Sequence, residues 1–184
     1  LNFVGELGWE LHHPIEMQNQ IFDAVMAAGS AFGIRPFGIR AMDSMRIEKS
    51  YRLIPRELSI EYAALESGLD RFVHLNKGDF IGARALADWQ AKGCSWSFVT
   101  LEVDDVTDAD ARGNEPIYLG DQLVGRATSG GYGWRTGKSL ALAMVRPDLA
   151  QTGQTLDISI LGKRHPATVI PDSPFDPANE RLKA

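Results

Sequence analysis

The sequence contains a single cysteine, Cys94, among its 184 residues, so it cannot form an internal disulfide. A disulfide-stapled secreted domain is therefore excluded, and a reducing compartment, the cytoplasm, is the expected location. No apolar run approaches the ~20 residues that a membrane-spanning helix needs. Positive charge is also scarce, because 19 Lys and Arg face 24 Asp and Glu, for a formal net charge of -5. Neither nucleic acid nor a membrane surface is therefore an expected partner.

Histidine is equally sparse, and the four that occur do not cluster. His12 and His13 are adjacent on a segment that we expect to be extended, so their rings would point to opposite faces. The other two, His74 and His165, are isolated in the sequence. No metal site is predicted, because a metal ion needs several ligands converging on one point.

One passage resembles a phosphate-binding loop but departs from it in two ways. Residues 137–139 read Gly-Lys-Ser, yet Tyr132 stands where the motif requires its first glycine. A phosphate loop also needs a helix after its Lys-Ser, whereas the short apolar run 140–145 ends before Pro147. Nucleotide binding is therefore not expected, and a strand is predicted in place of the helix.

What the sequence does contain is an ordinary globular composition, with 44% hydrophobic and 23% charged residues. That is enough for one large domain or two small ones. The chain begins at Leu1, without a methionine or a signal-like segment, so we expect it to be the C-terminal part of a longer protein. Oligomeric state is not indicated by the sequence.

The chain is organised around its first motif, residues 3–11, which read FVGELGWEL. From Gly8 onward the alternation predicts a short strand, with Trp9 and Leu11 facing the core and Glu10 facing the other side. Glycines allow other atoms to approach closely, so Glu10 is a candidate anchor for a small polar ligand. The alternative is a solvated glutamate on an edge strand.

Three helices and one further strand are expected before residue 93. The helices cover residues 15–28, 37–49 and 83–92, and the strand covers 71–75. In the first helix, an apolar stripe is expected to pack against the core; its members are Ile21, Phe22, Val25 and Met26. In the second, the expected buried stripe consists of Phe37, Ala41 and Met45.

The second helix also carries a mixed-charge face, formed by Arg40, Asp43, Arg46 and Glu48. Such a face is expected to be solvated, with weak pairing between charges three or four residues apart. Arg46 has an alternative role, in which it meets a ligand carboxylate.

At Gly93 the pattern changes to short strands separated by turn residues, which predicts a small β sandwich or barrel. The strands are expected at 97–103, 116–119, 123–128, 139–145, 156–161 and 167–170. We therefore place a domain boundary near residue 93, giving units 1–93 and 94–184 in an α+β protein. Residues 171–184, which contain three prolines, are expected to lie on the surface as a tail.

Five motifs, in this order along the chain, resemble the second half of the aminomethyltransferase family. The family includes the glycine-cleavage T-protein and the folate-binding parts of dimethylglycine and sarcosine dehydrogenases. The motifs are FVGELGWEL at 3–11, GIRAMDSMRIEK at 38–49, LESGL at 65–69, DFIG at 79–82 and TSGG at 128–131. The resemblance covers nearly the whole chain, and the ordered set of five motifs is more specific than any one of them.

The resemblance implies the end of a tetrahydrofolate-binding α+β region, followed by a small C-terminal β-barrel domain. It implies that Glu10 binds the pterin ring, since a carboxylate accepts paired hydrogen bonds from an amino and an N–H group. It also implies a folate contact at Phe3, where the family usually has tyrosine, with the hydroxyl lost. In the family an aspartate that precedes this region assists the folate nitrogen, so no catalytic residue is identified here, and the chain alone is expected to be inactive.

Two departures separate branches of the family. T-proteins carry an arginine where this chain has Met42, whereas residues 46–52 (RIEKSYR) look closer to the dehydrogenases. A non-enzymatic folate-binding branch linked to iron–sulfur assembly has Lys-Gly-Cys where this chain has Lys-Gly-Asp at 77–79. The favoured function is the folate half of a dimethylglycine or sarcosine dehydrogenase-like oxidoreductase, with FAD possible in a domain upstream.

Two other functions remain open. One is a stand-alone aminomethyltransferase or folate-dependent demethylase; the other is a non-catalytic folate-binding or structural module. In the catalytic cases the partners are small molecules, folate and an amine or methyl donor that the sequence does not identify.

Overall fold

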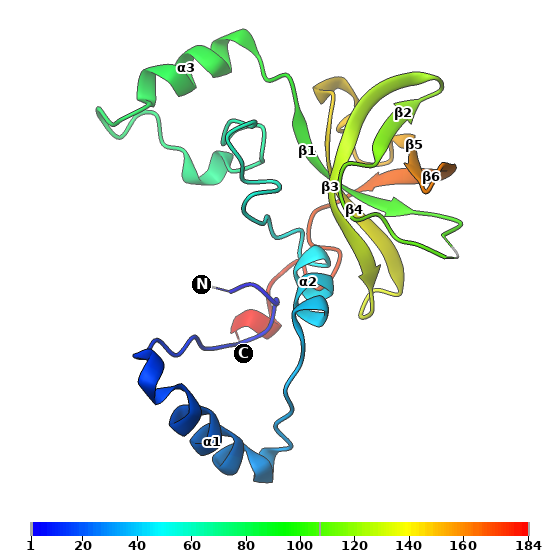
Figure 1. Cartoon of the computed structure of the whole chain (residues 1–184). Helices are drawn as coiled ribbons and strands as arrows, with labels where there is room; N and C mark the ends of the chain where they lie inside the picture. The colour runs from blue at the N-terminus through cyan, green and yellow to red at the C-terminus, as the bar shows by residue number, and fades with distance from the viewer. Residues whose placement is uncertain (1, 107, 184) are drawn as a thin grey trace.

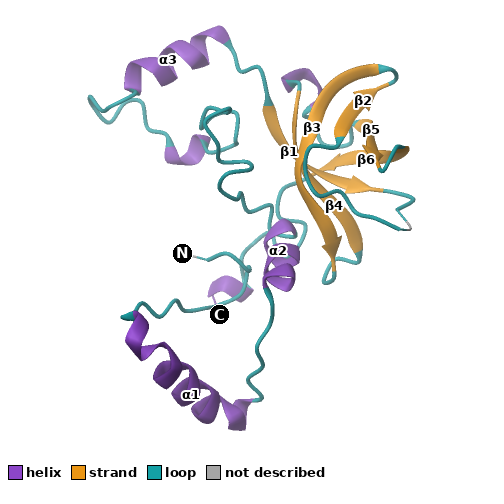
Figure 2. Ribbon diagram, viewed as in Figure 1, coloured by secondary structure: helices purple, strands orange, loops and turns teal. Residues whose placement is uncertain are grey.

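A closed six-stranded antiparallel barrel forms the C-terminal part of the structure, and helices joined by long loops extend away from it (Figures 1 and 2). The structure is a computed structural model that describes residues 2–106 and 108–183. The strands are β1 (Ser97–Val103), β2 (Pro116–Leu119), β3 (Gln122–Gly133), β4 (Lys138–Val145), β5 (Thr155–Ile160) and β6 (Lys163–Ile170). They are ordered β1-β4-β3-β2-β5-β6 around the barrel.

Alternating apolar residues on these strands form the core inside the barrel. Leu101, Ile117 and Ile158 are completely buried, from three different strands. Strand β4 is buried along almost its whole length, because its second face is covered by the loop before β1 and by helix α2 (Ile39–Ile47). The predicted barrel is therefore confirmed, and all six predicted strands are present.

A strand also begins at Lys138, where a phosphate-binding loop would need a helix. Within the described residues, no group of three or more His, Cys, Asp or Glu side chains is placed to hold a metal ion. No described helix is both long and apolar enough to cross a membrane.

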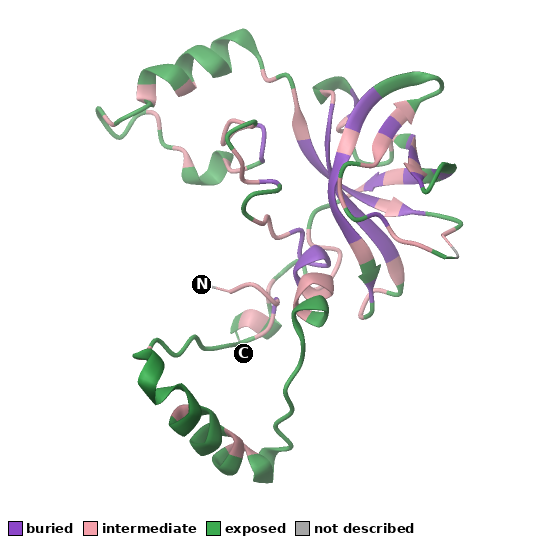
Figure 3. Cartoon of the chain, viewed as in Figure 1, coloured by how far each residue is buried: buried purple, intermediate pink, exposed green. Residues whose placement is uncertain are grey.

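Three α-helices precede the barrel, as predicted: α1 (Gln18–Gly29), α2 (Ile39–Ile47) and α3 (Ala83–Lys92). Short 3₁₀ segments lie at Ile15–Met17, Ser30–Phe32, Asp70–Phe72, Pro147–Leu149 and Arg181–Lys183. Helix α1 does not bury its apolar stripe, contrary to prediction: Phe22 is 55% exposed and no residue of the helix is buried (Figure 3). The physical reason is that, among the described helices and strands, α1 packs closely only against the short 3₁₀ segments beside it.

Helix α2 also differs from the prediction, because its buried side is charged. Phe37 and Ala41 are exposed, whereas Arg46 and Glu48 at the end of the helix are completely buried. This end of α2 packs on strand β3, where Arg46 donates to the Ser129 hydroxyl and Arg135 pairs with Glu48, while Asp43 and Glu57 balance the charge of Arg46. Their burial is tolerated because each charge is paired and hydrogen-bonded.

The two strands predicted outside the barrel are wrong. Residues 8–12 are extended without strand pairing, and Trp9 and Leu11 are exposed rather than facing a core. Residues 71–75 contain the end of a 3₁₀ turn instead of a strand. Alternation alone does not make a strand, because the backbone must also find a neighbouring strand to pair with.

Candidate functional site

A cavity of about 760 Å³ lies where four segments of the chain meet beside the barrel. They are the N-terminal turn, the residues that follow α2, the loop around residues 68–72, and the C-terminal tail. Figure 1 shows both chain ends close to α2, which brings segments more than 100 residues apart in sequence to one place. This volume is within the usual range for small-molecule sites.

The N-terminal wall of the cavity is a tight turn that includes Asn2 and Phe3. The Asn2 side-chain oxygen accepts hydrogen bonds from the backbone N–H groups of Val4 (3.1 Å) and Gly5 (2.7 Å). Gly5 has a φ of 73°, and a Cβ added there would lie 2.5 Å from Cγ of Lys49. The turn therefore requires glycine both for its left-handed backbone and for its close approach to Lys49.

Arg135, in the turn between β3 and β4, holds this N-terminal turn against α2. Its Nη1 donates to the Val4 carbonyl (3.2 Å) and to the Glu6 carboxylate (3.1 Å). Its Nε donates to the Glu48 carboxylate at 2.5 Å, and the guanidinium carbon lies 3.8 Å from the Phe175 ring centroid. A single barrel side chain thus joins the N-terminal turn, helix α2 and the C-terminal tail.

Lys49 fastens the C-terminal tail to the end of α2. Its three ammonium protons are matched by three acceptors, the carbonyls of Phe175 (3.0 Å) and Asp176 (2.6 Å) and the side-chain oxygen of Asn179 (2.8 Å). Burial lowers the pKa of Lys49, and the charge of Asp176 opposes that shift. Lys49 also lines the cavity, so it builds the wall and has no proton left for a ligand.

Cationic and aromatic groups line the other side of the cavity. Arg52 is bound by the Ser67 carbonyl (3.0 Å) and the Asp172 carboxylate (3.2 Å); burial lowers its pKa, and Asp172 opposes this. Arg71 stacks on Phe72, with 4.6 Å between the guanidinium carbon and the ring centroid. Among the described residues, none accepts a hydrogen bond from the Arg71 guanidinium. Its N–H groups are therefore available to a ligand in the cavity.

A second ionic network lies between α2 and the barrel, and its central pair, Arg46 and Glu57, is completely buried. Arg46 donates to Asp43 (2.6 Å), to the Tyr51 carbonyl (3.1 Å) and to Ser129 (2.8 Å), and it lies 3.4 Å from Glu57. Glu57 also accepts from the backbone N–H of Leu53 and from two barrel hydroxyl groups. The prediction that Arg46 is solvated is wrong. Its Nε, Nη1 and Nη2 atoms all donate to groups of the chain itself.

The three predicted folate-binding residues lie at different depths. Phe3 lines the cavity, whereas Arg46 lies outside it, in the buried network. Glu10 does not line the cavity either; its side chain is 64% exposed and its carboxylate lies 3.4 Å from His12. Glu6, the other glutamate of the first motif, is half-buried, pairs with Arg135 and lies 3.6 Å from Arg181. The folate contacts of all three stay predictions.

Several residues that line the cavity or hold its walls were not singled out in the sequence: Lys49 and Arg71 line it, and Arg135 holds the N-terminal turn. Lys49 lies within the motif 46–52, whose similarity to the dehydrogenases was the available signal. Arg135 gave no such signal, because its partners are 87 and 129 residues away in sequence.

Comparison with known proteins adds two family models that match this chain. Residues 1–77 match the GCVT N-terminal domain, and residues 97–176 match the glycine cleavage T-protein C-terminal barrel domain. The second match contains all six barrel strands.

Curated relatives align over most or all of the chain. It is 42% identical over 188 residues to mitochondrial dimethylglycine dehydrogenase of Homo sapiens, an alignment that covers 100% of this chain and 21% of that protein. It is 34% identical over 169 residues to an aminomethyltransferase of Desulfitobacterium hafniense, covering 92% of this chain and 46% of that protein. The chain therefore spans from about a fifth to just under half of these relatives.

The same fold occurs in a solved structure, the glycine cleavage system aminomethyltransferase T from Bartonella henselae. The two structures superpose with a TM-score of 0.86 over 95% of this chain and 48% of the other, at 22% sequence identity. With its two matching domains, its enzyme relatives and this shared fold, the chain belongs to the aminomethyltransferase family, that of the glycine cleavage T-protein.

Proposed function

We propose that this chain forms part of the tetrahydrofolate site of a dimethylglycine or sarcosine dehydrogenase-like oxidoreductase. The observation that carries the proposal is the alignment with dimethylglycine dehydrogenase, which covers the whole chain at 42% identity. A sarcosine dehydrogenase of Mus musculus also aligns over 100% of the chain, at 34% identity. In this proposal an FAD domain lies elsewhere in the protein, and residues 1–93 and 94–184 are the two units of the folate part.

The cavity has the chemistry that a folate needs. A pterin is a flat, polar heteroaromatic ring, and Phe3, Tyr51 and Phe72 supply aromatic faces among the cavity residues. The glutamate end of folate carries carboxylates, for which Arg71 offers a guanidinium with hydrogen-bond donors available. The volume of about 760 Å³ is adequate for a ligand of this size.

In this proposal each segment of the chain has a distinct role. Bound tetrahydrofolate would supply the nitrogen atoms that accept a one-carbon unit. Phe3 would stack on the pterin, and Glu10, two residues beyond the cavity residue Gly8, would turn inward to accept its N–H groups. Arg135 and Lys49 would keep the two terminal segments in place around the ligand, since positioning is the main contribution of a protein to such a transfer.

Titration with 5-formyltetrahydrofolate, a stable analogue, tests the proposal by calorimetry. We expect saturable binding that Phe3→Ala weakens by about 1 kcal/mol or more, the usual worth of an aromatic contact. Phe22→Ala is the matched control, because it removes the same side chain from an exposed position on α1 that does not line the cavity. An unchanged affinity in Phe3→Ala, or an equal loss in both variants, would contradict the proposal.

A stand-alone aminomethyltransferase is the second candidate, favoured by the alignment with the Desulfitobacterium protein, of which this chain matches a larger share. The two candidates differ in flavin content and in the amine used. Purification of the protein with bound flavin, and reduction of that flavin by dimethylglycine or sarcosine, would support the dehydrogenase. Transfer from a glycine-derived aminomethyl donor without flavin would support the transferase.

A further inference from the structure

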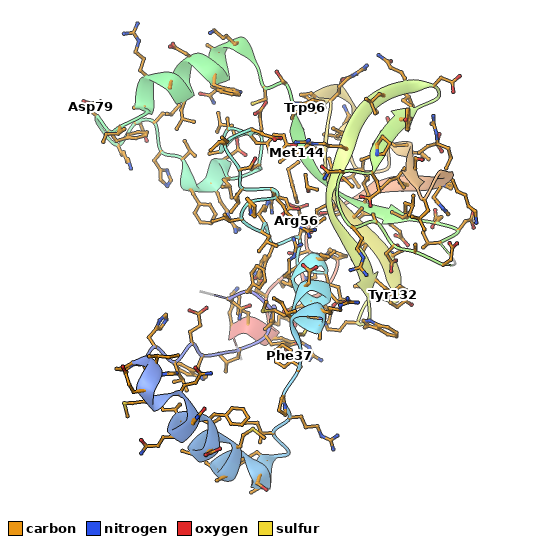
Figure 4. All side chains as sticks on the ribbon, viewed as in Figure 1. Phe37, Arg56, Asp79, Trp96, Tyr132 and Met144 are labelled. Atoms are coloured by element: carbon orange, nitrogen blue, oxygen red, sulfur yellow. The ribbon has the colours of Figure 1, made fainter. Side chains whose placement is uncertain are left out.

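A second hollow, of about 310 Å³, lies between the loop after α2 and strand β3 of the barrel. Its walls come from residues 55–61 on one side, and on the other from the segment before β2 and from β3. None of its lining residues also lines the cavity assigned to folate. Arg56, labelled in Figure 4, lies at this junction between the loop and the barrel.

The charge of this hollow is opposite to that of the chain as a whole. Three arginines line it, Arg56, Arg112 and Arg126, against one carboxylate, Glu61. The lining residues therefore carry three positive charges and one negative, and counting the Glu115 carboxylate bound to the backbone of Arg112 and Gly113 still leaves +1, in a chain whose net charge is -5. A concave site focuses such a local field and favours a negatively charged occupant.

The three guanidinium groups retain many hydrogen-bond donors. Arg56 uses one, donating from Nη1 to the Arg112 carbonyl at 2.6 Å. Arg126 donates from Nε and Nη2 to the Tyr62 hydroxyl (2.8 and 2.6 Å) and from Nη2 to Glu61, but no bond from its Nη1 is recorded within the described chain. For the Arg112 guanidinium, too, no acceptor is recorded among the described residues. Each guanidinium has five N–H groups, so most of the donors here are available.

The backbone that carries Arg112 is fixed in place. The Glu115 carboxylate accepts the N–H groups of Arg112 (2.8 Å) and Gly113 (2.7 Å), which closes the turn. Gly113 has a φ of 131°, and a Cβ there would lie 2.7 Å from the Thr128 carbonyl oxygen and 3.7 Å from Nη1 of Arg56. The glycine thus permits the close approach of Arg56 to the backbone of Arg112 and Gly113, and the site is organised before any ligand arrives.

We propose that this hollow is a binding site for a small oxyanion, a phosphate group or a carboxylate, bound by Arg56 and Arg112, which both line it. Both ligand groups present paired oxygens, which match the planar fork of a guanidinium. Arg126 adds charge from the barrel side, and its bonds to Tyr62 and Glu61 hold it in position. The site is independent of the folate cavity, and the proposal holds whichever one-carbon reaction the protein catalyses.

Calorimetric titration at low ionic strength, in a buffer without oxyanions, tests the proposal with two probes. Inorganic phosphate and succinate are titrated separately into the protein, and we expect at least one to bind saturably at one site. Tighter binding of phosphate would identify a phosphorylated ligand, and tighter binding of succinate a carboxylate ligand. Failure of both probes to bind would overturn the proposal.

Variants then locate the binding. We expect Arg112→Ala and Arg56→Ala each to weaken the affinity about tenfold or more, the effect of losing a hydrogen bond between charged groups. Arg112→Lys, which keeps the charge but loses the fork, should recover only part of the affinity. Arg84→Ala is the matched control, because Arg84 is an exposed arginine on α3, outside the hollow.

Two results in these variants would overturn the assignment. One is an affinity unchanged in both Arg112→Ala and Arg56→Ala. The other is an equal loss in Arg84→Ala, which would mean that the anion responds only to overall charge. Circular dichroism of each variant checks that the barrel remains folded, so a loss of affinity can be assigned to the missing guanidinium.

Discussion

Arg135 and Glu48 form an ion pair that locks the barrel to helix α2, with 2.5 Å between Nε of the arginine and Oε2 of the glutamate. The Glu48 side chain is only 1% exposed, and its other oxygen accepts the backbone N–H groups of Arg135 (2.7 Å) and Thr136 (2.8 Å). The carboxylate is therefore satisfied entirely by one turn of the barrel, between β3 and β4. The same guanidinium also binds the N-terminal turn, by donating to the Val4 carbonyl and the Glu6 carboxylate.

Replacing Arg135 by alanine should leave the buried Glu48 charge without its cation. We expect the free energy of unfolding to fall by about 3 kcal/mol, at the lower end for a broken buried pair because the two backbone N–H groups remain. Urea denaturation measures this. Glu6 and Val4 also lose their anchor, so affinity for 5-formyltetrahydrofolate should fall in the same variant, whereas Arg84→Ala should change neither quantity. Unchanged stability in Arg135→Ala would contradict the role assigned to this pair.

Gly5→Ala should disturb the wall of the cavity at a single point. The new methyl group would sit 2.5 Å from Lys49 Cγ on a backbone with a φ of 73°, so we expect a loss of about 1–3 kcal/mol in stability. Folate affinity should fall with it, because Phe3 is in the same turn. Gly8→Ala is the matched control, since the nearest atom to a Cβ at Gly8 is 3.8 Å away. Equal effects in the two variants would show that steric fit at Gly5 is not what matters.

Glu10→Gln should weaken folate binding by roughly 1.5 to 3 kcal/mol, the range for a hydrogen bond to a charged group. The amide puts a donor where the pterin presents its own donors. Glu6→Gln should change folate affinity little, and its partly exposed pairing with Arg135 is worth about 1 kcal/mol of stability. Titration of both variants decides between the two glutamates, and a large loss in Glu6→Gln with none in Glu10→Gln would reverse the assignment.

Cys94 should react slowly with iodoacetamide at pH 8. Burial, followed by the charges of Glu66 and Asp70, raises the pKa of this thiol above its ordinary value of 9.0, and the thiolate is the reactive form. Since the folded protein holds this proton more tightly than the unfolded chain does, the linked contribution makes stability fall as pH rises above about 9. The urea-unfolded chain, with the same single cysteine, is the control and should react faster; an equal rate would contradict the shift.

The barrel could be predicted from the sequence because its signals are local. Alternation along β1 and the glycines and aspartates between strands mark each strand without reference to distant residues. Helix α1 shows the limit of this reasoning. Its apolar periodicity correctly predicted a helix, but whether Phe22 and Val25 are covered depends on what packs there, and both are exposed in this structure.

The site was harder to predict, because charge and burial conflict in α2. Arg46 and Glu48 have the composition of a solvated face, and only their partners on β3 and in the following turn make burial possible. Those partners are more than 80 residues away in sequence. The family resemblance supplied Phe3, which does line the cavity, but periodicity gave no indication of the N-terminal turn or of the tail bound to Lys49.

Closure of the barrel affects how this unit can be joined to other polypeptide. Each described strand has two hydrogen-bonded neighbours, and β1, for example, pairs with both β4 and β6. A sheet without free edges cannot be extended by a foreign strand, so added chain contacts it only through side chains and loops. The barrel can therefore be joined to other polypeptide without a change in its own strand pairing. This fits its occurrence in relatives of very different length, since the chain matches about a fifth of one and nearly half of another.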